Sequence, residues 1–254
     1  MNSVTVVVLG RFPEIFNGFR ESADVYLPNA PKIFVRDQEL INIPTGDKWT
    51  TIQGPSVFNN PGNANLGWEA APKDDILYCG DDVRFTQSNT IELLQEAAYS
   101  DPKVGIISPK IIGAAGNALQ VNPRAEGLTY SDQRLAFICV LIKREVIDAV
   151  GYMDPVYGGS YGSDDSDYNY RVQLAGYKLA VTSSASVIHQ HAASTFTRTG
   201  PGVDCSTGAE KFRKKWGEEA WRKTEGFSPR DTAELQQAMI EAPTTRAIRF
   251  RRSK

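Results

Sequence analysis

Short apolar runs separated by helix-like stretches most restrict how this chain can fold. Val4 to Leu9 is a continuous run of mostly β-branched residues, which is typical of a strand buried on both faces. Further strands are expected at Val25–Leu27, Ile33–Val35, Trp49–Gln53, Asp75–Cys79 and Val104–Ser108, a turn at Asn60–Gly62, and helices at Asn63–Ala71 and Thr86–Tyr99. This alternation predicts an α/β fold with a mostly parallel sheet covered by helices on both faces.

The second half of the chain is less regular. Its strongest apolar run is Leu135–Ile142, followed by an expected helix at Lys143–Val150 that Gly151 would end. An acidic segment should open a helix at Asp164 that ends near Gly176. Beyond it we expect strands at Lys178–Thr182 and Ser186–His189, helices at Glu210–Trp221 and Asp231–Glu241, and a basic, flexible tail.

The composition narrows the class of protein. The chain has 254 residues, 41% hydrophobic and 23% charged, which are ordinary globular values. Its net charge of −2 disfavours general binding of polyanions. The three cysteines are far apart and form no CxxC pair, which fits a reducing compartment. With no signal-peptide pattern at the start and no long apolar stretch, the expected location is the cytoplasm, with peripheral membrane association as an alternative.

Two adjacent carboxylates, Asp81 and Asp82, follow Gly80 at the end of an expected buried strand. Ligands of open α/β sheets bind at the carboxyl ends of strands, and paired carboxylates suit a hard divalent cation. The alternative is an ordinary turn, in which Gly and Asp are common.

A second acidic group contains Asp164, Asp165 and Asp167. Acidic residues at a helix start are stabilised by the helix dipole and can cap free N–H groups, which explains many such clusters without function. Crowded carboxylates also raise one another's pKa, so one of them is a candidate general base. The preceding loop, rich in Gly and Tyr and including Tyr161, could shape an acceptor site.

The two histidines, His189 and His191, are the only ones in the chain. At positions i and i+2 of a strand they would face the same side. They could contribute to a metal site, or His189 could be a hydrogen-bonded core histidine.

In combination these motifs resemble the family-2 glycosyltransferases of GT-A fold, of rhamnosyl- or galactofuranosyltransferase type. The similar segments are Pro61–Gly67 (G-x-x-x-A-x-N-x-G), Ile76–Val83 (a D-x-D-type turn), Phe137–Asp154, Gly162–Gly176, Val187–His189 (V-I-H) and Phe212–Gly217 (a K-W-G helix). The resemblance implies a catalytic domain over residues 1–205, a helical extension over 206–242 and a tail over 243–254.

The resemblance also implies roles for single residues. Asp82 and His189 would bind a divalent metal, Mn²⁺ or Mg²⁺, that holds the diphosphate of a nucleotide-sugar donor. Asp165 would be the general base of an inverting transfer, with Asp164 as the other candidate. On the donor side it places Asp37, Asn65, Asp81, Gly10 and Arg11. Gly10 and Arg11 take the place of the family's usual Pro-Thr-Tyr-Asn after the first strand. On the acceptor side it places Tyr161, Asp167 and His191.

Gly80 departs from the family, because many members have an aspartate there. The expected acceptor is a glycan or lipid-linked glycan. A phage-type transferase acting on modified DNA bases is an alternative, since the basic tail could touch nucleic acid. A nucleotidyltransferase, a metal-dependent hydrolase and a non-catalytic nucleotide- or sugar-binding module are further alternatives.

Overall fold

The computed structural model describes residues 2–36, 48–55, 59–113, 117–159, 162–190 and 206–226. The strands are β1 (Val4–Gly10), β2 (Lys32–Arg36), β3 (Trp49–Gln53), β4 (Asp75–Gly80), β5 (Val83–Phe85), β6 (Val104–Gly113), β7 (Leu128–Ser131), β8 (Cys139–Ile142) and β9 (Lys178–His189). The helices are α1 (Pro13–Tyr26), α2 (Asn60–Glu69), α3 (Thr90–Ser100), α4 (Ala118–Val121), α5 (Arg144–Val150), the 3-10 turn η1 (Pro155–Tyr157), α6 (Asp164–Leu174), α8 (Ser206–Trp216) and α9 (Glu218–Glu225).

Within the described residues, nine strands form one mixed sheet in the order β3-β2-β1-β4-β8-β6-β9-β5, with β7 paired to β9. The four strands from β3 to β4 are all parallel, as are β6 and β9. The antiparallel pairs involve β8, β5 and β7. The expected α/β fold with a mostly parallel sheet is therefore confirmed, and the short strands supply its antiparallel part.

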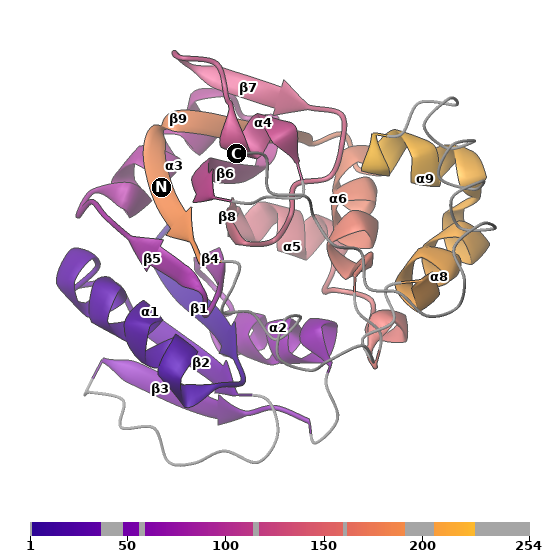
Figure 1. The fold of residues 1–254 in the computed structure, drawn as a ribbon. Helices are drawn as coiled ribbons and strands as arrows, with labels where there is room; N and C mark the ends of the chain where they lie inside the picture. Colours follow the sequence, from indigo (N-terminus) through magenta and orange to yellow (C-terminus); the bar gives the residue numbers. More distant parts are fainter. Residues whose placement is uncertain are drawn as a thin grey trace, which may run out of the picture.

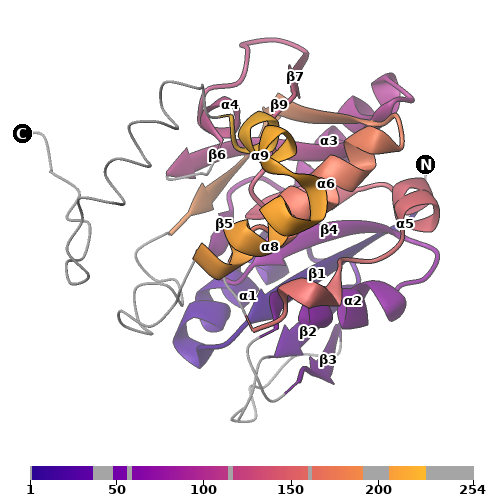
Figure 2. The same ribbon diagram turned by 90° about the vertical axis from the view of Figure 1, so that its right-hand side faces the viewer.

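Helices cover both faces of the sheet (Figure 1). One apolar cluster packs α1 and α3 on the sheet and includes Phe16, Phe19 and Leu94. The other packs α2, α5 and α6 on the opposite face and includes Trp68 and Tyr168. Helices α8 and α9 lie outside α6 (Figure 2), where a third, smaller cluster around Phe212 and Trp221 holds them.

Helix α1 replaces the strand expected at Val25–Leu27, and that prediction is wrong. Pro13 stands in the first turn, a position that tolerates its missing N–H. The buried side chains Ile15, Phe16, Phe19 and Ala23 recur at helical spacing. Gly18 lowers the helix propensity of this stretch, but a β-carbon there would lie 2.4 Å from the Arg84 guanidinium. Packing therefore favours glycine inside the helix.

Other boundaries moved in ways that have local causes. Helix α2 starts at Asn60, so the turn expected at 60–62 is its first turn, and the Asn59 side chain caps it. Helix α3 begins at Thr90, four residues later than expected. The two strands expected between 178 and 189 form the single strand β9, with an irregular register opposite Pro109 and Lys110.

The helix expected at Glu210–Trp221 is two helices that meet at Gly217. This residue has φ of 88°, a left-handed conformation that favours glycine. The helix expected at Asp231–Glu241 and the basic tail lie outside the described residues. In the part of the chain that the structure describes, no helix combines the length and the apolar character needed to span a membrane.

Candidate active site

The turn after β4 brings the expected metal ligands together. Strand β5 runs antiparallel to β9 with Val83 opposite His189, which places Asp82 beside the histidine. The Asp82 Oδ2 to His189 Nε2 distance is 3.2 Å, and both side chains are about nine-tenths buried. The N–H of Gln190 also donates to the Asp82 carbonyl, at 2.9 Å. Two residues more than 100 positions apart are thus fixed at one edge of the sheet.

Gly80 lies directly against the Asp82 carboxylate. A β-carbon at this position would come within 2.9 Å of Asp82 Oδ1, closer than real contacts allow. An aspartate at position 80 would require Asp82 to move. In this chain the glycine leaves room for Asp82 to turn toward His189.

Asp81 points to the other side, against the loop that follows β1. A β-carbon on Gly10 would lie 2.6 Å from Asp81 Oδ2, so glycine permits this approach. Burial and the charge of Asp82 raise the pKa of Asp81 to about 8, while a backbone hydrogen bond from Arg11 and the charge of Arg84 oppose the rise. Gly10, Arg11 and Asp81 therefore lie together where the parallel strands β1 and β4 end.

Arg84 supports this turn, although no sequence pattern singles it out. Its guanidinium donates to the carbonyls of Asp81 and Val83, at 2.9 and 2.7 Å, and to the carbonyl of Ile15 in α1, at 3.1 Å. It thereby ties the carboxylate turn to the helix that covers the sheet.

These residues fit a divalent cation that is only partly held by protein. Within the described ranges, no three His, Cys, Asp or Glu side chains lie close enough to form a complete metal site. A carboxylate and an imidazole side by side are nevertheless suitable donors for Mn²⁺, and Mg²⁺ commonly keeps waters and substrate phosphates among its ligands. Asp82 and His189 could thus hold a cation whose remaining ligands come from a bound diphosphate.

Asp164, at the start of α6, lies over the same strand. Its Oδ2 accepts a hydrogen bond from Asn60 Nδ2, and Asn60 Oδ1 in turn accepts from the Tyr78 hydroxyl at 3.1 Å. Tyr78 precedes Gly80 by two residues on β4 and so shares its face. Burial, followed by the charge of Asp165, raises the pKa of Asp164 to about 6. This carboxyl has the acidity of a general base that works near neutral pH.

Asp165 turns away from this chain of hydrogen bonds. Its Oδ2 lies 3.0 Å from Arg134 Nη1, and Arg134 Nε donates to both carboxylate oxygens of Glu225, at 3.0 and 2.9 Å. Ser166 Oγ also donates to Glu225. The two neighbouring aspartates therefore have different partners: Asp164 has Asn60 of α2, and Asp165 has Arg134 of the segment before β8.

Two expected substrate-binding residues have other partners. Asp167 is fully buried and accepts hydrogen bonds from Lys215, Trp216 and Arg171, at 2.7, 2.7 and 2.9 Å. Asn65 pairs through both ends of its amide with the backbone of Met153, at 2.9 Å each. These contacts hold helices and loops together, so we leave both residues out of the proposed site. Asp37, Tyr161 and His191 lie outside the described residues.

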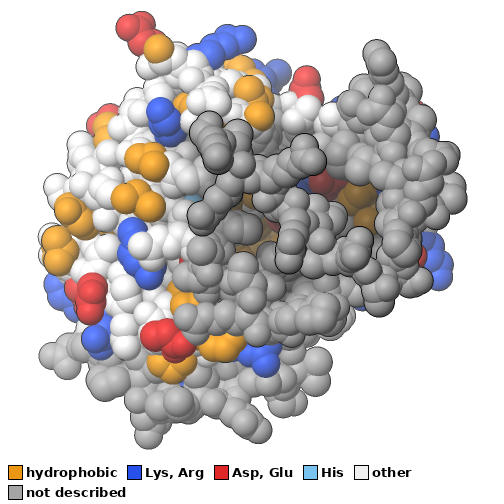
Figure 3. Space-filling model, in the orientation of Figure 1, with side chains coloured by type: hydrophobic (Ala, Val, Ile, Leu, Met, Phe, Trp, Pro, Cys, Tyr) orange, Lys and Arg blue, Asp and Glu red, His pale blue; other side chains and the backbone are white. Residues whose placement is uncertain are grey.

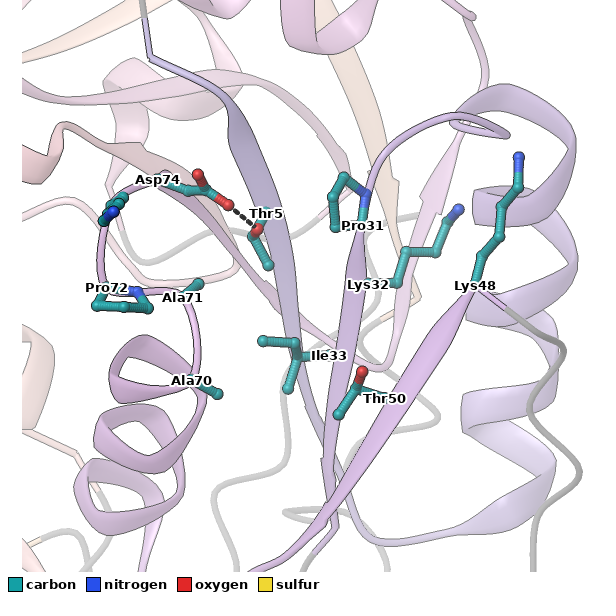
Figure 4. Close-up of a pocket in the computed structure, with 11 residues that line it drawn as sticks. Thr5, Pro31, Lys32, Ile33, Lys48, Thr50, Ala70, Ala71, Pro72 and Asp74 are labelled. Carbon is teal, nitrogen blue, oxygen red and sulfur yellow. Dashed lines mark hydrogen bonds between the residues drawn. The ribbon is translucent and has the colours of Figure 1, made fainter.

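A cavity of about 320 Å³ lies at the opposite edge of the sheet (Figure 4). It is lined by residues at the start of β1 and β2 and after α2, among them Thr5, Ile33 and Ala71. The Lys32 and Lys48 ammonium groups bind the carbonyls of Ala30 and Pro28. The cavity is remote from the carboxyl ends of the strands. The face seen in Figure 3 shows acidic side chains on the side of α6.

Comparisons with known proteins address the fold. No protein-family model matches the chain, and no curated protein is significantly similar to it in sequence. Its structure is similar to a mannosyltransferase from Pyrobaculum calidifontis solved with GDP-mannose and Mn²⁺ (TM-score 0.58, 13% identity, 95% of this chain and 76% of that one). It is also similar to a mycobacterial protein (TM-score 0.51, 11% identity, 75% and 68%). The likeness shows a GT-A-like glycosyltransferase fold.

Proposed function

We propose that this protein, which has the fold of a nucleotide-sugar glycosyltransferase, transfers a sugar from a nucleoside diphosphate to an acceptor hydroxyl. The observation that carries the proposal is the placement of Asp82 beside His189 at the carboxyl edge of a GT-A-like sheet, with the Asp164–Asp165 pair over the same strand. The similar mannosyltransferase binds GDP-mannose and Mn²⁺, which supports a donor of this class. The expected acceptor is a glycan or lipid-linked glycan.

Asp82 and His189 would hold the divalent cation. The cation, when bound, would neutralise charge that develops on the leaving diphosphate. Asp81 would stay on the donor side, against Gly10 and the backbone of Arg11. A single displacement would invert the anomeric carbon, as the resemblance to family 2 implies.

One carboxylate of the acidic pair would accept the proton of the attacking hydroxyl. The family resemblance gives this role to Asp165. The contacts favour Asp164, because the Asp165 carboxylate is already engaged in an ion pair with Arg134. Asp164 has an amide partner instead and a pKa raised to about 6. We therefore assign the proton to Asp164.

Two isosteric variants test this assignment. Asp164→Asn should lower the transfer rate by roughly 10²- to 10⁴-fold, the usual contribution of a general base, and leave donor affinity unchanged. Asp165→Asn should lower the transfer rate less than Asp164→Asn does. Rates would be measured with each nucleotide sugar and a mixture of glycan acceptors, and donor affinity by calorimetry. A larger loss in Asp165→Asn would return the role to Asp165, and full activity in both variants would reject the mechanism.

A further inference from the structure

Arg134 connects three parts of the chain that are distant in sequence. Its side chain bridges Asp165, 31 residues away, and Glu225, 91 residues away. All three charged side chains are largely buried, with 22%, 17% and 10% of the surface of Arg134, Asp165 and Glu225 exposed. Ion pairs this far from water are weakly screened, so the geometry is held more firmly than in a surface pair.

Hydrogen bonds to backbone carbonyls also join the segment around Arg134 to α6 and α9. The N–H of Arg134 donates to the carbonyl of Thr224 in α9, at 2.8 Å. Asn169 Nδ2 in α6 donates to the carbonyls of Leu135 and Asp165, at 2.9 and 2.7 Å. The segment that carries Arg134 is thus fixed to α9 on one side and to the start of α6 on the other.

These contacts hold the Asp164 and Asp165 carboxylates in different directions. Asp165 is held toward α9 by Arg134, and Asp164 is held toward α2 and β4 by Asn60. Ser163, which precedes the pair, has φ of 65°, the one non-glycine residue of the described chain with positive φ. Such a conformation persists only where the surroundings impose it. The direction of each carboxylate is therefore set by contacts on both sides of the turn.

We propose that Arg134 and Glu225 are positioning residues for the proposed transfer reaction: Glu225 of α9 holds Arg134, Arg134 holds Asp165, and Asp164 is the carboxylate that faces the acceptor hydroxyl. The proposal rests on the proposed function and extends it to the C-terminal helices. Helices α8 and α9 then form part of the catalytic unit, because α9 supplies Glu225.

The charges around Asp164 make the proposal testable by pH. Asp165 faces it from α6, Tyr78 from β4, Tyr157 from η1, and Arg134 from the segment before β8. Arg134 is the positive charge in this group, and Glu225 partly balances it. Removing Arg134 should raise the pKa of Asp164, and removing Glu225 should lower it.

Three variants and one control variant distinguish a positioning role of Arg134 and Glu225 from a purely structural role. Arg134→Gln should lower kcat by roughly 10- to 100-fold with little change in the donor KM, and move the acidic limb of the pH profile to higher pH. Glu225→Gln should also lower kcat but move that limb to lower pH. Arg134→Lys keeps the positive charge but loses the planar guanidinium that bridges two carboxylates. The acidic limb of the pH profile should therefore stay in place while kcat falls. Arg222→Gln removes only the 3.3 Å pair with Glu218 on α9, and should behave as wild type.

A second readout does not depend on turnover. The carboxyl-carbon resonance of Asp164, assigned with the Asp164→Asn variant, should titrate at higher pH in Arg134→Gln and at lower pH in Glu225→Gln. If the wild type transfers no sugar, the proposed reaction fails, whereas this resonance still tests the charge coupling. Unchanged titrations in both variants, or equal losses of kcat in them and in Arg222→Gln, would overturn the proposal.

Discussion

At the scale of single residues, Asp164 is harder to ionise in the folded protein than in the unfolded chain. Its pKa of about 6 lies above the ordinary value of an aspartate because the group is buried beside Asp165. The folded state therefore binds more protons between about pH 4 and pH 6, and stability falls as pH rises through this range, then stays level. The proposed site thus contains a carboxylate that lowers the stability of the fold at neutral pH.

We therefore expect Asp164→Asn to be more stable than wild type at pH 7, by on the order of 2 to 3 kcal/mol, and to show no such gain near pH 4. Urea unfolding at pH 4, 5, 6 and 7 measures the difference. Asp132→Asn, at an exposed aspartate, is the matched control and should change little at any pH. A stability difference that is the same at pH 4 and pH 7 would contradict a raised pKa for Asp164.

Residues next to the end of a regular element could be predicted from the sequence. Asp81, Asp82 and Asp164 follow a strand or open a helix, and hydrophobic periodicity marks such ends. Arg134 and Glu225 could not, since neither stands in a pattern and tertiary structure alone joins them across 91 residues. The role of a side chain whose partners are distant in the sequence cannot be predicted from the local spacing of residues.

At the scale of elements, Asp167 attaches α8 to α6. Its buried carboxylate accepts from Lys215 and Trp216 on α8 and from Arg171 on its own helix. Lys215 also reaches Asp154, which is 28% exposed, at 2.6 Å. The same lysine thus has one fully buried and one partly exposed partner, and only the loss of the buried one leaves charges uncompensated in the interior.

Asp167→Ala should accordingly destabilise the protein by roughly 3 to 5 kcal/mol, the usual cost of breaking a buried pair, and expose α8 and α9 to protease. Asp154→Ala removes the partly exposed partner and its hydrogen bond from the Val156 N–H, and should cost about 1 to 2 kcal/mol. Thermal unfolding and limited proteolysis of both variants make the comparison. Similar behaviour of the two would mean that α8 is held by its apolar contacts instead.

The parallel strands β1 to β4 follow their apolar runs closely, and sequence alone placed them. The elements it missed are short or internally mixed. Strands β5 and β7 have three and four residues, too few for a periodic pattern. Strand β9 was divided in the prediction because polar Ser183 and Ser184 interrupt it, where the pairing with β6 also shifts register. Helix α1 was missed because Gly18 and the Val25–Leu27 run conceal its helical spacing.

At the scale of the whole molecule, the site is assembled at the carboxyl edge of the sheet by elements from the entire chain. Strands β1 and β4 supply Gly10, Asp81 and Asp82, strand β9 adds His189, and helix α6 adds the acidic pair. The fold class and this edge could be predicted, because strand–helix alternation fixes both. The contribution of α9 could not, because it depends on how the C-terminal helices pack over α6.

In the proposed site a cation holds the diphosphate, so nucleotide should stabilise the fold only when the cation is present. UDP, GDP, dTDP and CDP, each with Mn²⁺, Mg²⁺ or EDTA, would be compared by thermal unfolding. One nucleotide at about 100 times its Kd should add ~2.7 kcal/mol, and EDTA should remove the gain. Asp82→Ala should lose it as well, whereas Asp132→Asn should keep it. Stabilisation that survives EDTA and the loss of Asp82 would place the diphosphate elsewhere, and no stabilisation by any nucleotide would contradict a nucleotide-sugar donor.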